Sequence, residues 1–130
     1  MINALIVLAA VIISGPITAE VVSVYDGDTF TVNSYPWPGM IIRVSVRVNG
    51  IDTPEIRGKC LAEKTLAIKA RNRAKELLSD EVYLVDIKRG KYAGRIVADV
   101  YLKSGKNLAE VLIKEELGRE YDGKKRKSWC

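Results

Sequence analysis

The stretch "IRVSVRVNGIDTPE", residues 42–55, decides how this chain folds, because two patterns meet in it. Residues 42–49 alternate between apolar and polar side chains, which predicts a β-strand with one buried face and with Arg43 and Arg47 on the other. The pair "NG" then turns the chain. The "DTPE" that follows has two interpretations. It is either a helix start, with an Asp or Thr cap and a proline in the first turn, or two carboxylates held three residues apart beside a rigid proline.

The helical pattern downstream separates these interpretations. After "DTPE", apolar residues recur at helical spacing from residue 61 to residue 78, which predicts a helix there. The polar segment "IRGK", which contains Gly58, lies between this pattern and "DTPE". The cap interpretation therefore requires a helix that begins at Pro54, and the pattern does not favour it.

Further strands are predicted on both sides of this region, from segments rich in β-branched residues. The expected strands are residues 17–25, 28–32, 42–49, 82–87 and 95–102, and the expected helices are residues 61–78 and 108–117. The order β-β-β-α-β-β-α predicts an OB-fold, which is a five-stranded β-barrel with helices, of class α+β. An open α+β sandwich is the alternative from pattern alone.

Composition narrows the chemistry. The 130 residues suit one domain, and the formal net charge of +5 with a pI of about 9.2 favours an anionic partner such as nucleic acid. A basic surface without a specific partner is the plainer alternative. The chain has no histidine, which excludes Ser-His and Cys-His catalysis and histidine metal sites. A carboxylate must then act as the proton acceptor if the protein is an enzyme.

The N-terminus predicts export. Residues 4–13, "ALIVLAAVII", form an apolar run that is short for a membrane span and carries no Lys or Arg. We expect residues 1–15 to be a signal peptide or membrane anchor and residues 16–130 to be a single domain with a basic C-terminal tail. A buried segment is the alternative. The protein would then be periplasmic, extracellular or membrane-anchored.

The redox state of the two cysteines depends on that compartment. Cys60 and Cys130 are either two buried thiols or one disulfide, and export favours the disulfide. It would close a loop of about 70 residues and contribute roughly 4 kcal/mol in the chain-entropy model.

Charge gathers at four places: "DGDT" at residues 26–29, Arg47, "DTPE" at residues 52–55, and "RGKYAGR" at residues 89–95. Each has a plain structural explanation, as a hairpin turn, a solvent-facing strand residue, a helix cap or a solvated loop. Together they suit phosphodiester hydrolysis. That reaction needs oxygen ligands for a hard cation, a base for the attacking water, and arginines for the phosphate oxygens.

The four places, in this order, resemble the pattern of the staphylococcal nuclease (thermonuclease) family, over residues 17–117. The resemblance implies an OB-fold, Ca²⁺-dependent endonuclease that acts on DNA and RNA, including single strands, and leaves 3′-phosphate ends. It implies these roles: Asp28, Asp52 and the Thr53 carbonyl as Ca²⁺ ligands, Asp26 behind them, Glu55 as general base, Arg47 and Arg95 on the scissile phosphate, Lys91 and Tyr92 on a neighbouring phosphate, and Tyr121 stacked on a base.

Three departures from the family pattern matter. The loop at residues 91–95 is one residue longer than its tightest version. Glu116 stands where a glycine should end the second helix, so we expect Gly118 to do so. A basic tail, "KKRKSWC", replaces the family's long C-terminal helix, and a Cys60–Cys130 disulfide would tie this tail to the loop after Glu55. The alternative function is a catalytically weak OB-fold module that binds nucleic acid, and a monomer is expected in either case.

Overall fold

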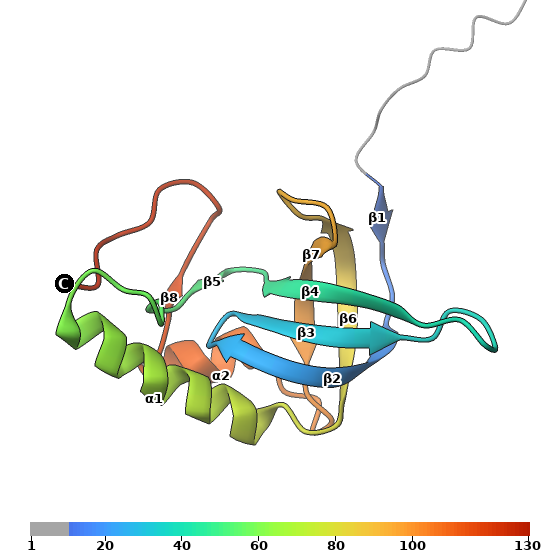
Figure 1. Cartoon of the computed structure of the whole chain (residues 1–130), viewed down its shortest axis with the longest axis horizontal. Coiled ribbons are helices and arrows are strands. Elements are labelled where there is room, and N and C mark those ends of the chain that lie inside the picture. Colours follow the sequence, from blue (N-terminus) through green and yellow to red (C-terminus); the bar gives the residue numbers. More distant parts are fainter. Residues whose placement is uncertain (1–10) are drawn as a thin grey trace, which may run out of the picture.

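The fold is a small closed barrel with two helices, described by a computed structural model for residues 11–130 (Figure 1). The barrel strands are β2 (Ile17–Asp26), β3 (Thr29–Ser34), β4 (Ile42–Val48), β6 (Glu81–Arg89) and β7 (Arg95–Tyr101). Neighbours pair in the order β6-β2-β3-β4-β7, and β6 also pairs with β7, which closes the sheet. The predicted OB-type barrel is confirmed, and the open sandwich is wrong.

Closure of so few strands requires strong bending. The pairing is antiparallel except between β4 and β7, where Ser45 lies opposite Arg95 in a parallel register. The register of β2 shifts twice along β3, and that of β6 shifts between Val85 and Lys88, where Asp86 has a φ of 50°. Such bulges add local twist, which lets a short sheet curl onto itself.

The first helix, α1 (Leu61–Leu77), begins where the sequence pattern begins. Its N-cap is Cys60, whose Sγ accepts the N–H of Glu63 at 3.4 Å. Small side chains at Ala67, Ala70 and Ala74 let α1 lie close against the barrel. Because residues 53–55 are not helical, the helix-cap interpretation of "DTPE" is wrong.

The second helix, α2 (Leu108–Lys114), is shorter than predicted and ends differently. Glu116 itself takes the left-handed conformation, with a φ of 62°. Its N–H reaches the Ile113 carbonyl at 3.0 Å, and the N–H of Leu117 reaches the Leu112 carbonyl at 2.9 Å, which is a Schellman ending. The expectation for Gly118 is therefore wrong. Gly118 instead gives space to Ile51, since a Cβ there would lie 2.4 Å from Ile51 Cδ1.

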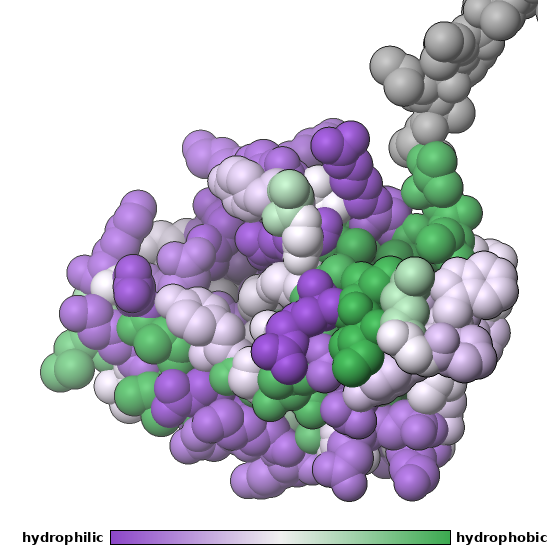
Figure 2. Space-filling view, turned by 45° about the vertical axis from the view of Figure 1, so that its right-hand side comes forward, coloured by the Kyte–Doolittle hydropathy of each residue, from purple (hydrophilic) through white to green (hydrophobic). Residues whose placement is uncertain are grey.

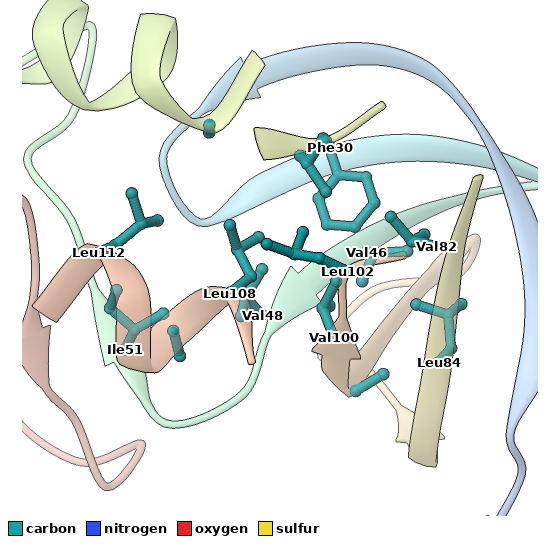
Figure 3. Packing of buried hydrophobic residues seen from close by; sticks show 14 of the residues in the cluster. Phe30, Val46, Val48, Ile51, Val82, Leu84, Val100, Leu102, Leu108 and Leu112 are labelled. Atoms are coloured by element: carbon teal, nitrogen blue, oxygen red, sulfur yellow. The ribbon is translucent and has the colours of Figure 1, made fainter. Parts of the chain in front are cut away.

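The core fills the barrel and continues beneath α2 (Figure 3). Phe30 and Val46, from neighbouring strands, are almost fully buried and point inward toward Val82 and Val100. Fully buried Leu108 and Leu112 in α2, with Ile51, extend this core to the end of β4. The segment that follows β4 is thereby fixed on a rigid base.

Two short pairings were not predicted. β1 (Ile12–Ile13) pairs with Ile87 and Lys88 of β6, and β8 (Arg119–Glu120) pairs with β5 (Ile51–Asp52). The leader proposed for residues 1–15 lies mostly outside the described residues. Within residues 11–130, no helix has the length and apolar character needed to cross a membrane.

The tail after β8 is irregular and runs back to the start of α1 (Figure 1). It ends in a disulfide between Cys60 and Cys130, whose Cα atoms are 6.0 Å apart. The predicted disulfide is present, and both cysteines take part in it.

Candidate active site

The β2–β3 turn and the segment after β5 meet through a buried hydrogen bond. Asp28 Oδ2 accepts the N–H of Thr53 at 2.9 Å, which joins "DGDT" to "DTPE". Asp28 in turn donates its own N–H to Asp26 Oδ1 at 3.1 Å. Gly27 makes the approach possible, because a Cβ there would lie 2.8 Å from Thr53 Cγ2. The fold therefore places residues 26–28 directly against residues 52–53.

Arg47 lies between the two carboxylates that the sequence proposed as ligands. Its Nη1 is 3.0 Å from Asp28 Oδ2, and its Nη2 is 3.9 Å from Asp52 Oδ1. Nη1 also donates to the Ile51 carbonyl at 2.9 Å. Both aspartates are buried, so their charges face Arg47 in a low dielectric.

Asp26 has a strongly displaced pKa. Burial, as the largest cause, and the neighbouring negative charge of Asp28 together raise this pKa from 3.8 to about 8. Asp26 is thus favoured in the protonated form near neutral pH, where it fixes the turn through the N–H of Asp28.

Glu55 is held through its main chain by a residue that the sequence analysis missed. The buried side chain of Glu63, in the first turn of α1, accepts the N–H of Glu55 at 3.2 Å and that of Lys59 at 2.9 Å. The hydrogen bond from Lys59 is the main cause that lowers the pKa of Glu63. The available signal was a glutamate three residues after the N-cap, as in a capping box. The Glu55 side chain itself is half-exposed.

These groups line one hollow of about 910 Å³. The predicted site residues in its wall are Asp26, Asp28, Arg47, Asp52, Glu55, Lys91, Tyr92, Arg95 and Tyr121. Thr53 lies behind the wall, fully buried. Tyr121 covers Arg47, with its ring centroid 5.8 Å from Arg47 Cζ. The structure therefore brings every predicted site residue to one place.

The C-terminal tail adds two residues that the sequence analysis missed. Arg126 Nε lies 2.7 Å from Asp52 Oδ1, its Nη1 pairs with Glu55, and its Nη2 lies 3.4 Å from the Thr53 carbonyl oxygen. Trp129 donates its indole N–H to Asp52 Oδ2 at 3.0 Å. No local pattern indicates these contacts, because they join residues more than 70 positions apart.

The oxygen atoms of this site suit a hard cation. Among residues 11–130, no three Asp, Glu, Cys or His side chains are clustered to hold a metal. The site offers three oxygen ligands, which are the carboxylates of Asp28 and Asp52 and the carbonyl of Thr53. Ca²⁺ accepts such ligands together with water. The guanidinium of Arg126 already contacts two of these three groups, which shows that they attract a cation. The residues fit Ca²⁺.

The chain is a small OB-fold barrel with buried acids and arginines at one rim. Proteins of this class are nucleases or nucleic-acid-binding modules. A family model described as staphylococcal nuclease homologue matches residues 45–128. The match covers well over half of the chain, which therefore belongs to this family. No curated protein matches the chain.

Proposed function

We propose that the protein is a Ca²⁺-dependent nuclease that hydrolyses phosphodiester bonds in DNA and RNA and leaves 3′-phosphate ends. The observation that carries this proposal is the joining of Asp28, Arg47 and Asp52 in one hollow with Glu55 at its edge. In this proposal a base, arginines and oxygen ligands for a cation would act together on one phosphate bound in the hollow.

Asp28, Asp52 and the Thr53 carbonyl would hold Ca²⁺, which supplies positive charge to the phosphate and lowers the pKa of water. Asp26 supports this set from behind, because its carboxyl group fixes the backbone of the turn that carries Asp28. Its proton also limits the repulsion among the buried carboxylates.

Glu55 is the proposed general base. Its main chain is fixed by Glu63 while its half-exposed side chain lines the hollow, from which it would accept a proton from the attacking water. Arg47 and Arg95 would bind the phosphate oxygens as negative charge builds on them.

Substrate contacts are proposed around this centre. Lys91 and exposed Tyr92 border the hollow and would bind a neighbouring phosphate, while Tyr121 would stack on a base. A stacking contact of this kind favours single-stranded DNA and RNA, whose bases are free to stack. The proposed protein is a monomer.

The disulfide supports the proposed compartment. A Cys60–Cys130 bond is consistent with an oxidising, exported location. We propose a periplasmic or extracellular protein, with residues 1–15 as a signal peptide or as an attachment to the membrane.

A chelator-controlled digestion tests the proposal. EDTA should abolish cleavage of single-stranded DNA by the purified protein, and excess Ca²⁺ should restore it. The products should carry 3′-phosphates, which block extension by a polymerase until a phosphatase removes them. Cleavage that continues in EDTA would refute the role of the cation.

A catalytically weak nucleic-acid-binding module is the second candidate, because Arg126 is paired with both Asp52 and Glu55. This candidate predicts that single-stranded DNA binds with the same affinity with or without Ca²⁺ and is not cut. A binding assay run beside the digestion separates the two candidates.

A further inference from the structure

We propose that Arg126 is a competing cation built into the chain, which sets how tightly the site binds Ca²⁺. The inference rests on the proposed function, since it concerns the same carboxylates. It assigns a role in cation affinity to the C-terminal tail, in place of a structural role alone.

The first argument is the position of the guanidinium. Arg126 contacts Asp52, Glu55 and the Thr53 carbonyl, and two of these are groups that would hold the cation. A divalent ion on Asp52 would lie within a few ångströms of a positive charge, and both compete for the same lone pairs. Calcium must therefore displace Arg126 from Asp52 as it binds.

The second argument is that the tail is tied down near the site. Cys130 is disulfide-bonded to Cys60, just before α1. Trp129 binds Asp52 and stacks under Arg119, whose Cζ lies 3.6 Å from the Trp129 ring centroid. Arg119 also donates to the Ser128 carbonyl at 2.9 Å. A tether of four residues keeps the effective concentration of the displaced guanidinium high.

Calcium titration by calorimetry tests this without any measurement of cleavage. Arg126→Ala should bind Ca²⁺ about tenfold more tightly than the wild-type protein. The matched control is Lys125→Ala, which removes one exposed positive charge from the same tail but no contact to the carboxylates. It should change the affinity less than about twofold. A Cys60→Ser/Cys130→Ser protein should also bind Ca²⁺ more tightly than wild type.

The outcomes separate this inference from the proposed function. Equal calcium affinity in wild type and Arg126→Ala, with calcium-dependent cleavage intact, overturns the inference alone. Equal gains in Arg126→Ala and Lys125→Ala also overturn it, because net charge would then explain the effect. If no variant binds Ca²⁺ and none cuts DNA, the proposed function fails and the inference fails with it.

A separate observation points to a lipid surface. Thirteen large hydrophobic residues are exposed in the described chain, and eight of them lie in two segments, β1 with Val11 and the β3–β4 loop with the first residue of β4. These eight are Val11, Ile12, Ile13, Tyr35, Trp37, Met40, Ile41 and Ile42. Figure 2 shows hydrophobic surface that runs from the β1 end of the chain onto the neighbouring face. We infer that this surface, the β1–loop surface, contacts a lipid bilayer.

Sequence and charge favour a bilayer as the occupant. Residues 1–10 directly precede Val11 in the sequence and contain nine apolar residues and no charged side chain. Trp37 and Tyr35 suit the membrane interface, and exposed Arg43 beside them suits anionic headgroups. The loop follows Ser34, whereas Asp28 and Arg47 lie at the other ends of β3 and β4. The hollow would then stay open to nucleic acid.

Trp37 fluorescence in the full chain tests this contact. The Trp129→Phe protein leaves Trp37 as the sole tryptophan. With vesicles of phosphatidylcholine and phosphatidylglycerol, brominated acyl chains should quench its emission. Ile41→Ser in this background should weaken the quenching, and Ile68→Ser, an equally apolar exposed position on α1, should not. Unquenched Trp37 overturns the inference, whether the protein stays free, binds through residues 1–10 alone, or uses this surface for a protein partner.

Discussion

Arg47 and Glu55 show how single residues divide the work at this site. Arg47 is fixed by two carboxylates and a carbonyl, whereas the side chain of Glu55 is half-exposed and meets only Arg126 among the described residues. A group that must accept and release a proton benefits from such access to water, and a group that binds a phosphate benefits from a fixed fork. The two environments match the two proposed roles.

Glu55→Gln tests the role of the base. The substitution keeps the shape of the side chain but removes its ability to accept a proton, so kcat on single-stranded DNA should fall about 10²–10⁴-fold. The control is Glu120→Gln, which removes an equal charge from exposed β8 near the site and should leave kcat within about twofold. An unchanged kcat in Glu55→Gln would assign the proton transfer to another group.

At the scale of elements, the first turn of α1 fixes the position of the segment that carries Glu55. Glu63 binds two main-chain N–H groups of residues 55–59, and Gly58 gives it space, since a Cβ there would lie 2.5 Å from Glu63 Cγ. "DTPE" is therefore not the cap of α1, yet α1 positions it.

Glu63→Gln tests this role of Glu63 through the pH dependence of the free energy of unfolding. The pKa of Glu63 is lowered in the folded protein below its ordinary value of 4.5, so its stabilising contribution is present above that pH and is lost as the pH falls through the folded pKa. The variant should lose about 1–3 kcal/mol of unfolding free energy at pH 7, and this difference should shrink below pH 4.5.

Urea unfolding at several pH values measures this. Glu110→Gln, at the exposed first turn of α2, is the matched control and should lose far less, because its side chain makes no hydrogen bond in residues 11–130. A loss in Glu63→Gln that does not change between pH 7 and pH 3.5 would show that packing, not the charged hydrogen bonds, carries the effect.

Elements with a strong local period could be predicted from sequence. The alternation of residues 42–49 and the helical spacing from Leu61 recur in β4 and α1 almost to the residue. β1, β5 and β8 could not be predicted, because strands of two residues have no period and depend on a partner that is distant in sequence. The end of α2 was misplaced because Glu116 adopts a conformation that usually indicates glycine.

The residues of the site likewise divide into those that could be predicted from sequence and those that could not. The acids and arginines of the family pattern were found because each lies in a short recognisable segment. Arg126 and Trp129 were missed because "KKRKSWC" has only a charge pattern, and nothing in it indicates which surface it covers. The Cys60–Cys130 bond could be expected from sequence and places the end of the tail near Glu55, but the individual contacts of Arg126 and Trp129 with Asp52 depend on the folded path of the tail.

At the scale of the whole molecule, the Cys60–Cys130 bond joins the tail to the start of α1 across 70 residues. In the chain-entropy model a disulfide that closes a loop of this length stabilises the folded state by roughly 4 kcal/mol, and measured values are typically about 2–4 kcal/mol.

The Cys60→Ser/Cys130→Ser protein should lose free energy of unfolding in that range, measured by urea denaturation. Reduced wild type should match it, and reductant should leave the double variant unchanged. Because the bond restricts the unfolded chain more than it adds contacts, release of the tail is measured separately, by Trp129 emission in a Trp37→Phe background, where Trp129 is the sole tryptophan. Equal stability of oxidised wild type and double variant would mean that the tail is held by Arg126, Trp129 and Arg119 alone.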